Sequence, residues 1–78
     1  LALFMHQTTT VHERISAAGA EERRRLAHGL RGAALGIGAH ALAEAAAAVE
    51  ADPDSRAFAR TLSRRIEEVR EFIAAISR

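Results

Sequence analysis

The feature that most constrains the fold of this chain is an apolar repeat in its last third. The repeated residues recur at three- and four-residue steps, as on one face of an α-helix, and are Phe58, Leu62, Ile66, Val69, Ile73 and Ile76. A single amphipathic helix is not stable alone, so this face must pack against other elements. Asp52-Pro53 precedes the repeat and combines a favourable N-cap with proline at the first helical position. We therefore predict a helix over residues 53–77.

The composition indicates that the other elements are helices too. The chain has 78 residues with a single proline, few aromatic residues and many alanines, a composition that favours helices over strands. A chain of this length forms one small domain, so we expect a single all-α domain over residues 1–78. The absence of cysteine excludes disulfide bonds and thiolate metal sites.

Three further helical segments precede the last one. The first covers residues 1–17, and we expect it to begin earlier in the natural protein because no cap precedes Leu1. Its apolar stripe consists of Leu1, Phe4, Thr8, Val11 and Ile15. The second starts near Ala20 and ends between Gly36 and Gly38, and the third covers residues 39–51. Four helices with short connections predict an antiparallel, up-down-up-down four-helix bundle.

The second helix is predicted to have a buried and an exposed stripe. The buried stripe consists of Leu26, Leu30, Ala33 and Ile37. The exposed stripe consists of Arg24, His28, Arg31, Gly32 and Leu35. Gly36 and Gly38 bracket the end of this helix, where a left-handed cap favours glycine. The third helix is predicted to bury Ala39, Leu42, Ala46 and Val49.

The exposed stripe of the second helix contains a candidate reactive group, His28. A neutral imidazole is a good nucleophile near neutral pH. Arg31 lies one turn away on the same face and can contact phosphoryl oxygens. Glycine inside a helix costs about 1 kcal/mol relative to alanine, and Gly32 beside the ring would leave room for a partner. This pattern is suited to presenting an imidazole to a phosphorylated partner.

The segment that contains this histidine reads His28-Gly29-Leu30-Arg31-Gly32-Ala33-Ala34. It resembles the phosphoacceptor motif of histidine-containing phosphotransfer (HPt) domains, which have His, a small residue, an apolar residue, Lys or Arg, Gly and two small residues. The resemblance continues through Ile37-Gly38-Ala39, Leu42, Ala45 or Ala46, and Val49-Glu50. The chain departs from the usual pattern at Gly29, where the family usually has Ser, Thr or Ala.

The resemblance implies a four-helix bundle that acts as a phosphorelay intermediate of bacterial two-component systems. His28 would accept a phosphoryl group from an aspartate of a response-regulator receiver domain and pass it to another receiver. Glu50 would bind the inner nitrogen of the ring. The receiver supplies the aspartate and Mg²⁺, so no cofactor or metal of the chain's own is expected. The chain would be a phosphocarrier without kinase activity, with receiver domains and a hybrid histidine kinase as partners.

Four side chains are predicted to extend the partner-binding face around His28. Leu35 offers an exposed apolar anchor on the same stripe, and Arg24 belongs to an arginine run that can steer an acidic partner. Gln7 and Leu3 lie on the outer part of the predicted first helix and would extend the patch.

Other classes of function are disfavoured by the charge and the hydropathy. The formal net charge is only +1, which is weak support for nucleic-acid binding. No apolar stretch is long enough to span a membrane, and no signal-peptide pattern is present. We therefore expect a cytoplasmic protein that binds neither nucleic acid nor membrane.

Two alternatives remain beside the phosphorelay intermediate. One is the dimerisation and phosphoacceptor hairpin of a sensor histidine kinase, in which an acidic residue follows the histidine and a proline lies nearby. His28 is followed by Gly29, and His12-Glu13 has only the acidic neighbour. Such a hairpin must dimerise, whereas a complete four-helix bundle is expected to be monomeric. The other is a bundle that binds a receiver without transferring phosphate.

Overall fold

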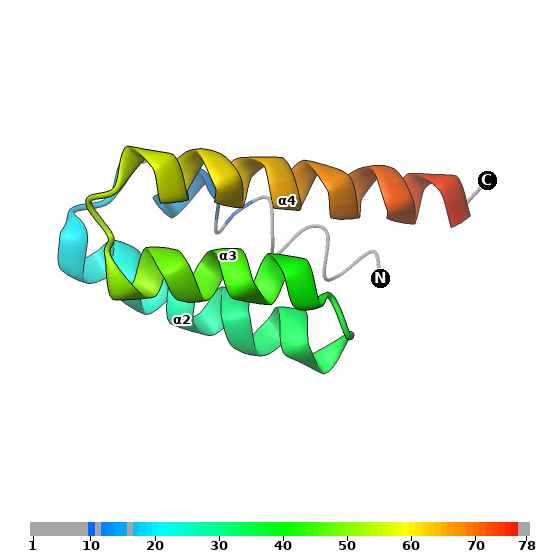
Figure 1. Ribbon diagram of the computed structural model, residues 1–78, viewed down its shortest axis with the longest axis horizontal. Coiled ribbons are helices and arrows are strands. Elements are labelled where there is room, and N and C mark those ends of the chain that lie inside the picture. The colour runs from blue at the N-terminus through cyan, green and yellow to red at the C-terminus, as the bar shows by residue number, and fades with distance from the viewer. Residues whose placement is uncertain (1–9, 11, 16, 77–78) are drawn as a thin grey trace.

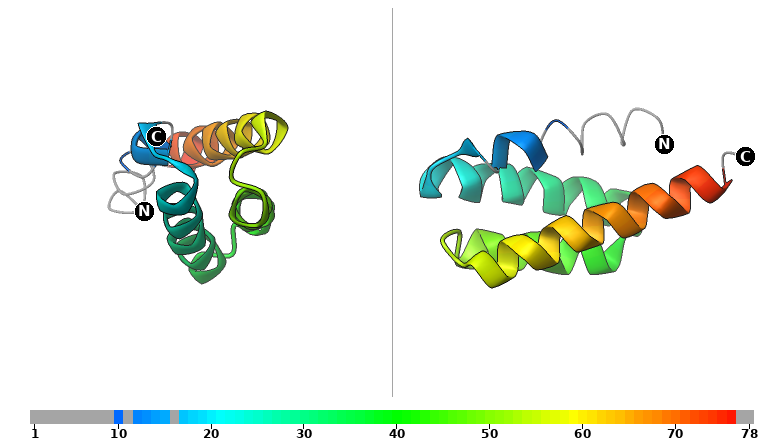
Figure 2. Two further views of the ribbon diagram at one scale, coloured as in Figure 1. Left: turned by 90° about the vertical axis from the view of Figure 1, so that its left-hand side faces the viewer. Right: turned by 90° about the horizontal axis from the view of Figure 1, so that it is seen from above.

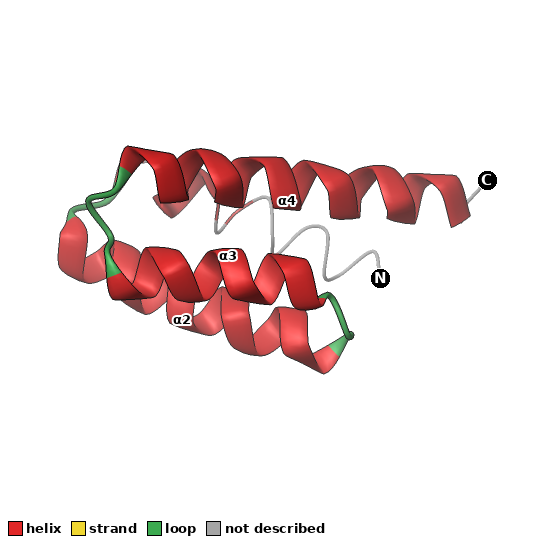
Figure 3. Cartoon of the chain, in the orientation of Figure 1, coloured by secondary structure: helices red, strands yellow, loops and turns green. Residues whose placement is uncertain are grey.

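The described part of the chain is entirely helices and their connections. The computed structural model describes residues 10, 12–15 and 17–76, and these contain no β-strand (Figure 3). Three helices have complete bounds: α2 is Ala20–Gly36, α3 is His40–Ala51 and α4 is Arg56–Ile76. Residues 10, 12–15 and 17 are helical as well. The predicted all-α fold is confirmed, whereas the predicted stripe residues Leu1, Phe4, Thr8 and Val11 lie outside the described residues.

The helices surround a common core. Successive helices α2, α3 and α4 run in alternating directions (Figure 1), and α3 packs against both of the others. The helical residues before α2 lie on the fourth side, as the end-on view in Figure 2 shows. There, His12 Nε2 is 2.9 Å from Ser63 Oγ of α4, and Arg14 pairs with Glu22 of α2 at 3.1 Å.

The core combines large side chains from two helices with small ones from a third. The buried hydrophobic residues are Ile15, Ala27, Leu30, Ala34, Leu42, Ala43, Ala45, Ala46, Val49, Leu62, Ile66 and Ile73. The largest fully buried side chains come from α3 and α4, whereas two of the three buried residues of α2 are alanine. The inward face predicted for Leu42, Ala46 and Val49 is confirmed.

The buried stripe of α2 differs from the predicted one. Leu30 is buried as predicted, but its buried neighbours are Ala27 and Ala34. Ala33 and Ile37 are exposed, so their predicted burial is wrong. The packed face of α2 is rotated about the helix axis toward Ala27 and Ala34, whose small side chains allow a neighbouring helix to approach closely.

The apolar face of α4 is buried only along its middle. Leu62, Ile66 and Ile73 are buried, whereas Phe58 is 38% exposed and Ile76 is 53% exposed. The predicted burial of these two outer residues is therefore wrong. α4 has 21 residues and α3 has 12, so α4 extends beyond α3 at its C-terminal end (Figure 1), which leaves Ile76 uncovered. Phe58 lies in the first turn of α4, at the opposite end.

The connection between α3 and α4 places the start of α4 later than predicted. Asp52 follows the last residue of α3 and donates its N–H to the Ala48 carbonyl at 3.0 Å. The cap of α4 is instead Ser55, whose Oγ accepts the N–H of Phe58 at 3.2 Å. The predicted cap at Asp52 and helix start at Pro53 are therefore wrong, because a second capping residue follows the proline.

One arginine joins the two connections at the same end of the molecule. The side chain of Arg23 is only 24% exposed, and its guanidinium donates to the carbonyls of Ile15, Ala18 and Pro53. These carbonyls belong to the segments before α2 and after α3, which lie at one end of the bundle (Figure 1). Arg23 thus satisfies backbone acceptors from two connections with a single charged group.

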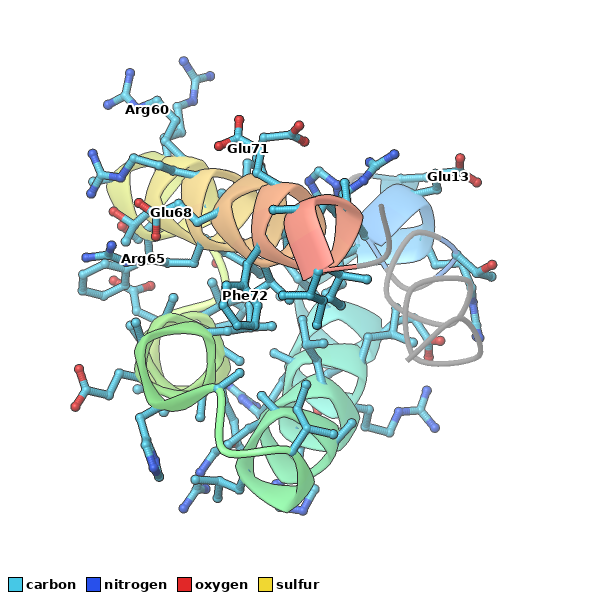
Figure 4. The ribbon with its side chains drawn as sticks, turned by 90° about the vertical axis from the view of Figure 1, so that its right-hand side faces the viewer. Glu13, Arg60, Arg65, Glu68, Glu71 and Phe72 are labelled. Carbon is cyan, nitrogen blue, oxygen red and sulfur yellow. The ribbon has the colours of Figure 1, made fainter. Side chains whose placement is uncertain are left out.

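The outer surface of α4 is charged. The side chains of Arg60 and Glu71 project away from α2 and α3, and Arg65 lies beside Glu68 (Figure 4). Arg65 Nη1 is 2.9 Å from Glu68 Oε1, one turn along the helix. Pairs of this kind at a surface contribute little to stability, so they mark this face as solvated.

The turn between α2 and α3 depends on a left-handed glycine. Gly38 has φ +78°, and its N–H donates to the Leu35 carbonyl at 3.1 Å while the Ala39 N–H donates to the Ala34 carbonyl at 2.9 Å. This pair of bonds is the Schellman arrangement that ends many helices. Gly36, in contrast, is the last residue of α2 and has no positive φ. Gly38 therefore sets the point at which the chain reverses.

We expect Gly38→Ala to lower the free energy of unfolding by about 1 kcal/mol, because a Cβ is strained in the left-handed region. Gly36→Ala is the matched control. No atom lies within 4 Å of a Cβ added there, and alanine is the better helix former, so stability should be unchanged or higher. Urea denaturation of both variants checks this, and equal losses for the two would contradict the assigned role of Gly38.

Candidate functional site

The candidate site lies where the middle of α2 faces the end of α3. His28 is on the exposed side of α2, with 70% of its side chain accessible. Glu50 is the penultimate residue of α3, which runs antiparallel beside α2 (Figure 1). The His28 Nδ1 atom is 2.6 Å from Glu50 Oε2, so the two helices together make a short hydrogen bond at the rim of their interface.

The second oxygen of the same carboxylate faces a cation. Arg31 Nη1 is 3.4 Å from Glu50 Oε1, and the Glu50 side chain is 24% exposed. The hydrogen bond from His28 is the largest cause that lowers the pKa of Glu50, followed by the charge of His28 and the contacts with Arg31, while partial burial opposes them. Glu50 is therefore an ionised acceptor at neutral pH.

An ionised carboxylate sets the proton position on the ring. A carboxylate can only accept hydrogen bonds, so the ring nitrogen that faces Glu50 carries the proton in the neutral imidazole. His28 Nδ1–H is then the donor, and Nε2 keeps its lone pair on a ring that is mostly exposed. A neutral imidazole with an accessible lone pair is a nucleophile that needs no separate base.

The surface beside the His28 ring is a shallow hollow that is open to solvent. It is lined by His28, Arg31, Gly32 and Leu35. A Cβ added at Gly32 would meet no atom within 4 Å, so packing does not demand glycine there. Leu35 is 50% exposed. The structure thus brings four residues of the predicted exposed stripe together at one surface.

The remaining predicted partner-binding residues have different outcomes. Arg24 shares this face, with 46% of its side chain exposed, but its guanidinium contacts Glu21 Oε1 at 2.6 Å and the main-chain carbonyl of Glu50 at 3.2 Å. Gln7 and Leu3 lie outside the described residues. The sequence analysis did not predict the contacts of Arg24 and Arg31 with Glu50. The placement of both arginines on the same helix face as His28 was the feature that could have indicated them.

The described residues form neither a metal-binding cluster nor a membrane-spanning helix. No group of three or more histidine, aspartate or glutamate side chains is arranged to hold a metal ion among residues 10, 12–15 and 17–76. Within those same ranges no helix combines the length and apolar character that crossing a bilayer requires. The reactive geometry that these residues do show is the pairing of His28 with Glu50.

Comparison with known proteins gives one match. The family model described as Hpt domain matches residues 1–77. No curated protein and no solved structure matches the chain. The family match covers nearly all of the sequence, including the whole of α2, α3 and α4, and is thus much wider than the segment around His28.

We expect carboxyl-carbon NMR titration to give Glu50 a pKa below its ordinary value of 4.5. His28→Ala should raise this pKa more than Arg31→Ala, because the hydrogen bond from His28 is the largest cause of the shift. A larger rise with Arg31→Ala would contradict the assignment of His28 as the main partner of Glu50.

The same shift predicts a pH dependence of stability. A carboxyl group whose pKa is lowered by folding stabilises the protein above its unfolded pKa, and this part is lost as pH falls through the folded value. The parent should therefore lose stability on acidification below about pH 4.5 more steeply than Glu50→Gln, which has no group to titrate there. Parallel stability curves for the two proteins would contradict the shift.

Proposed function

The chain belongs to the Hpt domain family, which implies histidine phosphotransfer, and we propose that it is a phosphorelay intermediate with His28 as the phosphoacceptor. The observation that carries this assignment is the 2.6 Å contact between His28 Nδ1 and Glu50 Oε2. It supports a ring held in one orientation with Nε2 free to react. In this proposal the phosphoryl donor is an aspartyl phosphate of a response-regulator receiver domain, and a second receiver is the acceptor.

The transfer step needs no proton movement in this chain. The lone pair of His28 Nε2 attacks the phosphorus atom, the N–P bond forms, and the P–O bond to the receiver aspartate breaks. The bonding electrons leave with the aspartate carboxylate. The ring keeps its Nδ1 proton and becomes cationic, and the Glu50 carboxylate stabilises that charge. Transfer to a second receiver is the same step in reverse.

The other residues of the hollow bind and admit the partner. Arg31 lies one turn from His28 and can move from Glu50 to the oxygens of the phosphoryl group. Gly32 leaves space for the receiver to approach, and Leu35 offers it an apolar contact. The receiver supplies the Mg²⁺ and the aspartate. We propose that Gln7 and Leu3 extend this docking face.

The same proposal implies an oligomeric state and a cellular location for the protein. We infer that the complete chain is an antiparallel, up-down-up-down four-helix bundle that works as a cytoplasmic monomer, a state that leaves the His28 face open. Its partners would be receiver domains and a hybrid histidine kinase, and the chain would carry phosphate without kinase activity of its own. The family match favours this over the dimeric hairpin of a sensor kinase.

We expect His28→Gln to abolish phosphoryl acceptance from a phosphorylated receiver while leaving the fold intact, because the side chain is 70% exposed and contributes nothing to the core. Acid-labile phosphate on the chain and helical circular dichroism are the measurements. Normal acceptance by the variant would show that another residue carries the phosphate. A parent chain that binds receivers but accepts no phosphate would indicate a non-transferring bundle.

Gly32→Gln separates partner access from stability. Glutamine should raise stability by about 0.5–1 kcal/mol through helix propensity, since its Cβ meets open space. It should slow transfer from a receiver strongly, because it occupies the surface where the receiver approaches, and should affect labelling by phosphoramidate much less.

Gly29→Ala is the control for this experiment, because it raises helix propensity while keeping a small residue at this position of the motif. Gly29 also has open space at its Cβ position, but it is not part of the hollow beside the ring. This variant should gain similar stability and keep receiver-dependent transfer. Equal loss with both donors in Gly32→Gln, or equal loss in the two variants, would contradict a role of Gly32 in partner access.

A further inference from the structure

Arg24 connects α2 to the main chain of α3 beside the phosphoacceptor. Its Nε donates to the Glu50 carbonyl oxygen at 3.2 Å, and its Nη1 donates to Glu21 Oε1 at 2.6 Å. The first contact crosses between helices, and the second lies within α2. The Arg24 guanidinium therefore binds a carboxylate on its own helix and a main-chain carbonyl on the next helix.

The acceptor on α3 is one that the helix itself leaves without a partner. Carbonyls in the last turn of a helix lack the N–H four residues ahead, and Glu50 is the penultimate residue of α3. The last turn of α3 also contains no basic side chain that could cap it. Arg24 supplies the missing donor from the neighbouring helix.

This contact lies next to the bond that orients the ring. Arg24 precedes His28 by four residues, so the two side chains share one face of α2. α2 therefore holds Glu50 at two points: Arg24 binds its main-chain carbonyl and His28 binds its carboxylate. Holding the backbone limits the positions that the carboxylate can adopt relative to the ring.

We propose that Arg24 is a positioning residue for the phosphoacceptor. By fixing the last turn of α3, it keeps the Glu50 carboxylate on Nδ1 of His28, which keeps the proton on Nδ1 and the lone pair on Nε2. The inference rests on the proposed function of His28 for its consequence in phosphotransfer. It gives Arg24 a role inside the site in addition to the partner binding that the sequence predicts.

Arg25 offers a matched control. Its Nη2 is 2.6 Å from Glu22 Oε2, an ion pair of the same spacing and length as that of Arg24 with Glu21. The Arg25 side chain is 76% exposed, and the contact described for it lies within α2. Substitution of either arginine therefore removes one charge and one surface ion pair, but only Arg24 also bridges to α3.

The test combines the tautomer state of the His28 ring with the rate of its labelling by a small phosphodonor, which requires no receiver domain. Nitrogen NMR of the histidine ring measures the fraction of the Nδ1–H tautomer, and phosphoramidate labelling measures the reactivity of Nε2. We compare the parent with Arg24→Gln, Arg24→Lys and Arg25→Gln. Lysine keeps the charge and can still donate a hydrogen bond, but it lacks the planar fork that serves two acceptors at once, so Arg24→Lys tests whether both acceptors must be held together.

We expect both Arg24 variants to lose Nδ1–H tautomer and to be labelled about three- to tenfold more slowly, the range that corresponds to one hydrogen bond. Arg25→Gln should match the parent in both measurements. Denaturation should show both Arg24→Gln and Arg25→Gln folded, with Arg24→Gln less stable by no more than the contribution of one hydrogen bond, since the surface ion pairs themselves contribute little.

Parent-like tautomer fractions in both Arg24 variants, or an equal change in Arg25→Gln, would overturn the positioning role. Loss of the Nδ1–H tautomer in Arg24→Gln with its retention in Arg24→Lys would still support the role, because the lysine ammonium can also donate to the Glu50 carbonyl. A parent that accepts phosphate from neither phosphoramidate nor a receiver would refute the proposed function, and the tautomer comparison would still decide whether Arg24 positions Glu50.

Discussion

The close packing of α2 on α3 is the constraint on which the rest of this structure depends. The buried positions of α2 include Ala27 and Ala34, and α3 buries Ala46, all three with no exposed surface. The distance between packed helices depends on the side chains at their contact, so larger residues here would move the helices apart. His28 lies next to Ala27 in the sequence, and its hydrogen bond to α3 is 2.6 Å long. A small increase in separation would break it.

The charge around Glu50 follows from this approach. One glutamate receives the ring of His28, the guanidinium of Arg31 and, through its main chain, the guanidinium of Arg24. The pKa of its carboxyl is lowered chiefly by the hydrogen bond from His28. His28 thus favours the ionised form of Glu50, and the Glu50 carboxylate in turn favours the proton on Nδ1 of His28. In the proposed transfer step the ring gains positive charge, and the attraction between the two groups increases as the N–P bond forms.

The remaining elements keep this edge of the bundle in place and accessible. Arg23 ties the two connections at one end, and Gly38 reverses the chain at the other end of α2 and α3. Gly32 has a lower helix propensity than other residues would have at this position. The open space at its Cβ position shows that packing does not require glycine there. In the proposed function, the stability that this residue costs is the consequence of keeping the His28 face clear for a partner.

Local patterns in the sequence determined much of this architecture. The 3.6-residue repeat defined the helices, Gly36 and Gly38 bracketed the end of α2, and the exposure of His28 and Leu35 followed from their place opposite Leu30. The interpretation of Glu50 came from a family resemblance, since helix periodicity alone placed it only at an edge. These features could be predicted because they depend on neighbours within one or two turns.

The tertiary structure decided what depends on distance between helices. It turned the buried face of α2 toward Ala27 and Ala34, because the positions of the neighbouring helices decide which face of α2 is covered. It exposed Ile76, since α4 is longer than the helix that covers it. It also gave Arg24 an acceptor on α3, a contact that no spacing within α2 encodes. A sequence pattern specifies the direction in which a side chain points from its helix. The atoms that the side chain contacts depend on the position and the length of the neighbouring helix.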